Sequence, residues 1–173
     1  MNVEQIMSRP VITCRASDTL NSAAGLMWEN DLGALPVVDD DGAIAGMVTD
    51  RDVCMATYTS GKSISTICVR DAMSTNAISC MPSDTLGDAE LKMAEAQIHR
   101  LPIVDSRKRP IGMVSIYDIA RATAGLGKRQ AIETLGTLTA ICAPRQAGTL
   151  QKVKTEKRVA PNGASGAALP ASH

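Results

Sequence analysis

The feature that most constrains the fold of this chain is an internal duplication. Shifting the sequence by 66 positions places Val3 on Val69 and aligns the two halves without a gap. About twenty of some fifty aligned positions are identical, far above chance for unrelated segments. Each copy alone is too small to bury its apolar face, so the two repeats must pack together.

Both repeats have the same predicted order of elements: short strand, helix, strand, strand, helix. Runs of β-branched residues predict strands at 36–38 and 102–104, and each is followed by a turn into a second strand. The first turn, 40–42, is acidic, whereas its counterpart at 106–109 is basic. The predicted fold class is α/β, or α+β: tandem β-α-β-β-α repeats followed by a flexible C-terminal tail. The predicted helix N-caps are Asp18 and Asp84.

The chain divides into two repeats, a linker and a tail. The repeats cover 3–60 and 69–124, and residues 61–68 form a polar linker between them. The segment 125–173 is basic and is expected to be largely disordered, with one short helix at 129–138. A solvated tail is the preferred interpretation. Nucleic-acid binding by the tail stays open as an alternative but is not favoured, because its charges are spaced out.

Composition excludes several classes of protein. The chain has no phenylalanine, one tryptophan and two tyrosines, too few for the stacking platforms of a single-strand nucleic-acid binder. The chain has five cysteines, an odd number, and no two of them are close in sequence. This pattern does not suggest a disulfide framework and therefore favours a reducing compartment. Cys14 and Cys80 are equivalent in the two repeats, which suggests a packing role. No apolar run reaches membrane-spanning length, so we expect a cytoplasmic protein without membrane contact.

One duplicated motif suggests chemistry. Thr49 and Ser115 each stand three positions before a carboxylate, Asp52 or Asp118, where a predicted strand leads into a helix. The first N–H groups of a helix lack internal partners and favour a phosphate, while the carboxylate can accept hydrogen bonds from ribose hydroxyls. The alternative is purely structural: the carboxylates favour the helix dipole, and the hydroxyl groups cap the helix.

The residue inventory argues against an enzyme. His99 is the only histidine outside the carboxy terminus, so a His-dependent triad has no second candidate, and nothing beside it has metal-ligand spacing. We therefore expect no catalytic residues, no metal and no required cofactor.

Taken together, the duplicated motifs resemble those of the cystathionine-β-synthase (CBS) domain pair, or Bateman module. The resemblance covers 3–124 and rests on Leu-Pro-Val/Ile-Val-Asp, Gly-Met-Val-Thr/Ser-x-x-Asp, Met-Ser and Ser-Asp-Thr-Leu, each present twice. It implies a stand-alone, bacterial-type module whose repeats pack through their sheets with pseudo-twofold symmetry. It also implies two clefts for AMP, ADP, ATP or S-adenosylmethionine, and a homodimer.

The resemblance also assigns roles to residues. Asp52 and Asp118 would accept hydrogen bonds from the ribose, and Thr49 and Ser115 would donate to the α-phosphate or the sugar edge. Other residues would form an apolar seat for the base or aim positive charge at phosphates. The two clefts are expected to be unequal, and the cleft that Arg100 faces is left open. The candidate nucleotide-binding residues are Thr13, Leu35, Pro36, Met47, Thr49, Arg51, Asp52, Ile78, His99, Arg100, Leu101, Pro102, Met113, Ser115 and Asp118.

These inferences favour a regulatory module that senses an adenosine-type ligand and passes its occupancy to an unknown protein target or an oligomer. A structural dimerisation adaptor with empty clefts is the alternative, and a nucleic-acid role of the tail is a third hypothesis.

Overall fold

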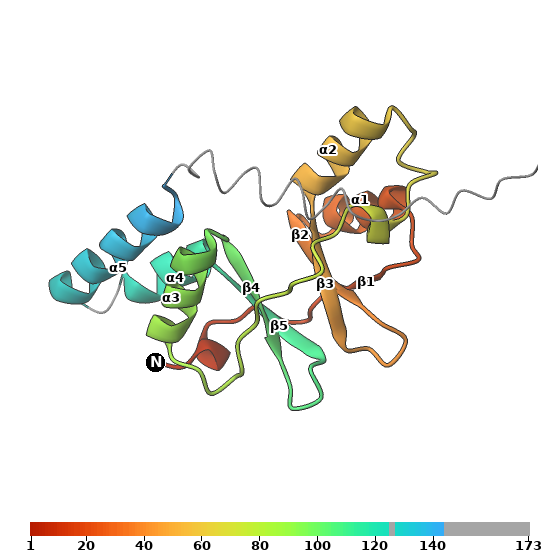
Figure 1. Cartoon of the computed structure of the whole chain (residues 1–173). Helices are drawn as coiled ribbons and strands as arrows, with labels where there is room; N and C mark the ends of the chain where they lie inside the picture. Colours follow the sequence, from red (N-terminus) through yellow and green to blue (C-terminus); the bar gives the residue numbers. More distant parts are fainter. Residues whose placement is uncertain (125–126, 144–173) are drawn as a thin grey trace, which may run out of the picture.

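The computed structural model describes residues 1–124 and 127–143 (Figure 1). It confirms the α/β class and the two β-α-β-β-α repeats, each preceded by a short 3-10 turn. The first repeat comprises η1 (Val3–Gln5), β1 (Cys14–Arg15), α1 (Leu20–Glu29), β2 (Ala34–Val38), β3 (Ile44–Thr49) and α2 (Asp50–Ser60). The second comprises η2 (Val69–Asp71), α3 (Leu86–Ala96), β4 (Arg100–Val104), β5 (Pro110–Ser115) and α4 (Ile116–Thr123), and α5 (Lys128–Ile141) follows it.

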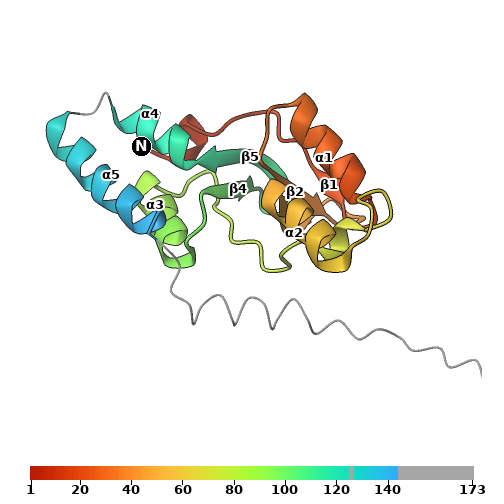
Figure 2. The same cartoon turned by 90° about the horizontal axis from the view of Figure 1, so that it is seen from above.

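The two small sheets lie between the helices of the two repeats. In the first repeat β1 pairs in parallel with β2, and β2 pairs antiparallel with β3. In the second, β4 and β5 form the same hairpin, and a single bridge from Cys80 to Ile103 replaces β1. Seen from above, α1 and α2 cover one end of the molecule, while α3 and α4 cover the other and α5 lies outside them (Figure 2).

The helix N-caps differ from the predicted ones by one residue. Thr19 and Thr85 cap α1 and α3, and their hydroxyl oxygens accept backbone N–H bonds of 3.1 and 3.2 Å. The Asp18 carboxylate instead accepts the N–H of Arg15 at 2.7 Å, and Asp84 accepts a hydrogen bond from the Lys92 ammonium at 2.8 Å. The prediction of Asp caps was wrong because these carboxylates fix the loop before the helix.

The two cores are completed by exchanged segments. Val3 of η1 is fully buried in the core of the second repeat, and Val69 of η2 is fully buried in the core of the first. The Val3 N–H donates to the Asp84 carbonyl at 2.9 Å, and the Val69 N–H donates to the Asp18 carbonyl at 2.8 Å. Burying a valine side chain stabilises a fold by about 1.5–3 kcal/mol, so each repeat depends on the segment that leads into the other.

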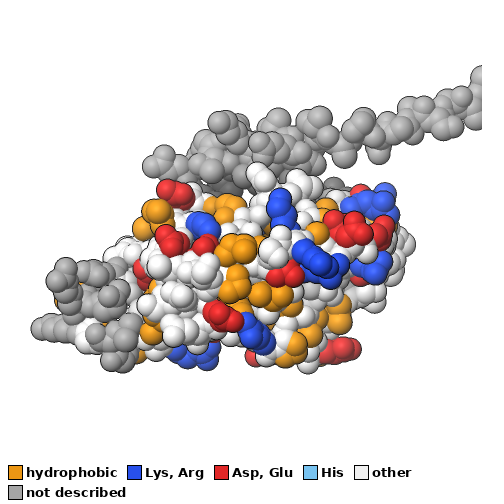
Figure 3. All heavy atoms as spheres, turned by 90° about the horizontal axis from the view of Figure 1, so that it is seen from below, with side chains coloured by type: hydrophobic (Ala, Val, Ile, Leu, Met, Phe, Trp, Pro, Cys, Tyr) orange, Lys and Arg blue, Asp and Glu red, His pale blue; other side chains and the backbone are white. Residues whose placement is uncertain are grey.

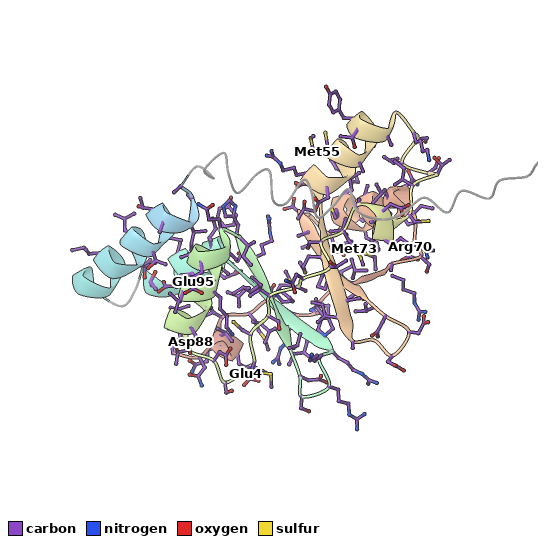
Figure 4. All side chains as sticks on the ribbon, in the orientation of Figure 1. Glu4, Met55, Arg70, Met73, Asp88 and Glu95 are labelled. Atoms are coloured by element: carbon purple, nitrogen blue, oxygen red, sulfur yellow. The ribbon has the colours of Figure 1, made fainter. Side chains whose placement is uncertain are left out.

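The segments that follow η1 and η2, called the leading segments of the two repeats, each cross a strand of the other repeat at a glycine. Ser74 exchanges two backbone hydrogen bonds with Met47 of β3, of 2.9 and 3.0 Å, and Ser8 does the same with Met113 of β5, at 2.9 and 3.2 Å. A Cβ atom on Gly46 would collide with the Ser74 carbonyl oxygen. The preceding residue, Met73, also lies against the first repeat (Figure 4).

The hairpin turns of the two repeats meet at the end opposite α2. The N–H of Ile44 donates to the carbonyl of Lys108 at 2.9 Å, which joins the start of β3 to the second turn. The acidic turn, 39–41, therefore adjoins the basic turn, 107–109. On this side acidic and basic side chains lie interspersed among small apolar patches (Figure 3).

Helix α5 is longer and better packed than predicted. It lies across α3 and α4, and Ile141 is 1% exposed within the second core. The Gln97 side-chain amide donates to the Ala143 carbonyl at 3.2 Å, which holds the end of the helix. The expectation of a short helix at 129–138 in a largely disordered tail is corrected to this extent; residues 144–173 lie outside the described residues. No helix in the described ranges is long and apolar enough to cross a membrane.

We expect Gly46→Ala to destabilise the protein more than Gly112→Ala. At Gly46 the obstacle is backbone, so the Ser74 crossing must shift, at a cost of about 2 kcal/mol or more. At Gly112 the obstacle is the Met7 side chain, which can turn aside, so we expect about 1 kcal/mol. Urea unfolding monitored by circular dichroism measures both. Equal losses, or the reverse order, would contradict the crossing geometry.

Two substitutions on α5 test its packing. Ile141→Ala should lower the free energy of unfolding by about 2–4 kcal/mol, because it leaves a cavity in the second core. Leu135→Ala, on the same helix but exposed, should change it by less than about 0.5 kcal/mol. If the two variants unfolded at the same urea concentration, α5 would not be docked as described.

Candidate functional site

The duplicated motif forms a capping box at the start of α2 and again at α4. In the first repeat the Thr49 hydroxyl oxygen accepts the N–H of Asp52 at 3.1 Å, and the Asp52 carboxylate accepts the N–H and O–H of Thr49 at 3.1 and 2.9 Å. The Ser115–Asp118 box has the same pattern, with bonds of 3.3, 2.8 and 2.6 Å. All four side chains are half-buried.

Capping alone does not identify a ligand site. Thr85 and Asp88 form the same box at α3, although this position belongs to no predicted cleft. The Thr85 hydrogen bonds lower the pKa of the exposed Asp88 carboxyl. The capping boxes at α2 and α4 therefore differ from the box at α3 only if their neighbouring residues can bind a ligand.

Arg100 lies at the box of the first repeat, although it belongs to the second. A Cβ atom on Gly33 would lie 3.0 Å from the guanidinium nitrogen of Arg100 and 3.3 Å from the Asp50 carboxylate. The Asp50 N–H donates to the Gly33 carbonyl at 3.2 Å, so this loop and the first turn of α2 are held together. Within the described residues Arg100 makes no ion pair. Arg100 therefore lies on the side of the first repeat, next to the first turn of α2.

The second-repeat box has different surroundings. The Arg121 guanidinium forms an ion pair with Asp118, whose side chain is 11% exposed. Met55 occupies the position of Arg121 in the first repeat and cannot form such a pair. His99 replaces Gly33, and its carbonyl accepts the N–H of Ile116 at 3.0 Å. The His99 side chain is exposed, as is Arg51 beside the first box.

The predicted apolar seat divides between the two faces of each sheet. Leu35 and Leu101 are fully buried in the cores, where they present no side-chain surface to a ligand. Pro36 pairs with Met47 across the first hairpin and Pro102 with Met113 across the second, so these pairs lie on the opposite face. On that face Pro36 and Pro102 are buried, and only the methionines are half-buried, so the two prolines present little surface to a ligand.

The segments that carry Thr13 and Ile78 are exchanged between the repeats. Residues before Ile78 pair with β3 through Ser74, and residues before Thr13 pair with β5 through Ser8. The stretch that leads to Ile78 therefore crosses the first repeat, and the stretch that leads to Thr13 crosses the second.

A hollow of about 390 Å³ opens at the hairpin end, away from the helix N-termini. It is lined by Ile44, Val104 and parts of 75–81 and 105–108. Five residue steps separate Ile44 from Thr49, or roughly 16 Å along an extended strand. The hollow therefore opens at the end of β3 away from the α2 box.

Neither a nucleophile nor a metal centre is assembled in the described part of the chain. Burial raises the pKa of Cys14 to about 11. It also raises that of Cys80, although the nearby Lys92 opposes the shift. Both thiols stay protonated at neutral pH, which fits the packing role predicted for them. No group of three or more His, Cys, Asp or Glu side chains that could hold a metal ion occurs within 1–124 and 127–143.

Comparison with known proteins divides the chain into the same two repeats. The family model for the CBS domain matches residues 3–58 and 69–125. The CBS domain-containing protein YhcV of Bacillus subtilis is 40% identical over 119 residues, which cover 69% of this chain and 83% of YhcV.

Solved structures agree with this result. The CBS domain pair of MJ0100, in complex with 5′-methylthioadenosine and S-adenosyl-L-methionine, has a TM-score of 0.66 at 26% identity and covers 73% of this chain and 98% of that one. Hypoxic Response Protein I with two coordinated zinc ions has a TM-score of 0.64 at 30% identity, covering 70% and 98%. The chain therefore belongs to the CBS domain family, with one CBS domain in each repeat.

Proposed function

We propose that this CBS pair is a regulatory module that binds an adenosine nucleotide at the first-repeat box and transmits occupancy to a protein partner. The observation that carries the proposal is Arg100, a half-buried residue whose guanidinium has no ion-pair partner in the described residues and lies beside the N-terminus of α2. A cation and a helix N-terminus together favour an anion such as a phosphate. MJ0100, a structural neighbour, binds adenosine compounds.

In this proposal the residues divide the ligand among them. Asp52 accepts the ribose hydroxyls, Thr49 donates to the sugar edge or the α-phosphate, and Arg100 binds the phosphates. The base rests against Met47 and Ile78. A charge-assisted hydrogen bond contributes roughly 1.5–3 kcal/mol, so Arg100 favours AMP, ADP or ATP over S-adenosylmethionine, which has no phosphate.

The second cleft is weaker in this proposal. A ribose there must compete with Arg121 for Asp118, and Ala34 stands where the first cleft has Arg100. Arg121 is largely exposed, so breaking its ion pair costs only about 0.2–1 kcal/mol. The difference between the clefts therefore comes mainly from Arg100.

Zinc binding and catalysis are less well supported than nucleotide binding. The zinc ions of Hypoxic Response Protein I have no matching ligand group among the described residues, so we do not extend zinc binding to this chain. The raised pKa values of Cys14 and Cys80 also give no support for either thiol as a nucleophile.

Replacing Asp52 should weaken nucleotide binding at least tenfold. The change Asp52→Ala removes the ribose acceptor and half of a capping box, so Asp88→Ala serves as the matched control: it removes the same half of the box at α3. Isothermal titration with AMP should show the loss for Asp52→Ala and an unchanged affinity for Asp88→Ala. If no adenosine compound shifts the melting of the native protein, although a ligand at a hundred times its Kd adds about 2.7 kcal/mol, the structural adaptor is favoured instead.

The contact with phosphate is tested by comparing two ligands. Arg100→Gln should lower the affinity for AMP by about tenfold or more and leave that for 5′-methylthioadenosine within about twofold, because only AMP carries the phosphate. Titrations of both ligands into the same variant measure the ratio. Equal losses for the two ligands would place Arg100 in a structural role.

A further inference from the structure

Three of the differences between the repeats meet at one place. A Cβ atom on Gly33 would lie 3.0 Å from the Arg100 guanidinium and 3.3 Å from the Asp50 carboxylate. The residues at the aligned positions of the other repeat are His99, Ala34 and Ile116. The aligned positions therefore hold no matching pair of opposite charges, and the arrangement at the start of α2 is particular to the first-repeat box.

The Asp50 carboxylate lies where an anion would approach the start of α2. It accepts the N–H of Arg51 at 2.6 Å, which is one of the N–H groups that a helix leaves without an internal partner at its first turn. Asp50 and Arg100 both lie within 3.3 Å of one point, yet they form no ion pair. Asp50 is exposed, so its charge faces the solvent from which a ligand arrives.

Resting on the nucleotide site proposed above, we infer that Asp50 is a specificity-determining residue that limits the phosphate charge accepted by the first-repeat box. It favours a nucleoside monophosphate over a triphosphate. A first phosphate in contact with Arg100 and the α2 N-terminus gains more from that contact than it loses to the more distant Asp50. Each further phosphate adds negative charge that Arg100 has already been used to balance, and Asp50 repels that charge.

The charges of the ligands set the size of this effect. AMP carries about two negative charges at neutral pH, and ATP carries about four. Two unit charges about 6 Å apart in water change an affinity by roughly threefold, and salt reduces that factor. Asp50 should therefore discriminate against ATP relative to AMP by about threefold to tenfold.

The test removes the charge of Asp50 and keeps its shape. Asp50→Asn retains an oxygen that can accept the Arg51 N–H, so the start of α2 is preserved. Isothermal titration at low salt, without divalent cations, should show that the native chain binds AMP more tightly than ATP. In Asp50→Asn the affinity for AMP should rise by about threefold and that for ATP by about tenfold or more. The affinity for 5′-methylthioadenosine, which has no phosphate, should stay within about twofold.

Asp41→Asn is the matched control for the loss of one negative charge. Asp41 is also exposed, and it lies in the hairpin turn at the end of the molecule opposite α2. This variant should leave the affinities for all three ligands unchanged. If it changed the ratio of the AMP and ATP affinities as much as Asp50→Asn does, the effect would come from net charge and the assigned role of Asp50 would be wrong.

Other outcomes separate this inference from the proposed function on which it rests. If the native chain binds AMP but the ratio of the AMP and ATP affinities is the same in Asp50→Asn, the role of Asp50 is overturned and the nucleotide site is kept. A native chain that prefers ATP has the same meaning, because Arg51 or another cation then outweighs Asp50. If neither the native chain nor Asp50→Asn binds any adenosine compound, both proposals fail.

Circular dichroism checks that Asp50→Asn is folded. If it is not, Asp50→Ile takes its place, because the second repeat has Ile116 at this position of the same capping box. The expected change in the ratio of the two affinities is the same, and an unchanged ratio in Asp50→Ile counts against the inference.

Discussion

The exchange of leading segments is the constraint on which the rest of this structure depends. Neither core is closed by its own stretch of chain, because Val3 completes the second core and Val69 the first. The backbone bonds of Ser8 and Ser74 then fix each segment across a strand of the other repeat. The two repeats are consequently one folding unit, and a boundary drawn along the sequence does not separate two independent cores. The same arrangement places Arg100 of the second repeat beside the start of α2 in the first.

The sequence predicts the repeat architecture well because the duplication is a property of the sequence itself. It cannot predict the exchange, since Val3 and Val69 are identical and either assignment of them to the cores gives the same apolar pattern. The error at the helix N-caps has a similar origin: Asp18 and Thr19 are both good capping residues, and the choice depends on the loop that uses the Asp18 carboxylate.

Helix α5 shows where local signals are overridden. The glycines at 125, 127 and 136 favour an interrupted, weakly helical tail by propensity alone. Tertiary packing decides otherwise, because Ile141 finds a place in the second core. For the candidate site, the sequence identified the boxes, which are local. It could not identify the side on which Arg100 lies, because that depends on how the repeats are arranged.

Differences between the repeats concentrate where packing does not dictate the residue. The glycines at 46 and 112 and the two boxes are retained in both, because backbone approach and helix capping require them. Arg100 and Ala34 occupy equivalent positions, as do Arg121 and Met55, and both differences lie near the boxes. The two repeats thus share the same backbone crossings and capping boxes, while the charged side chains near the boxes differ.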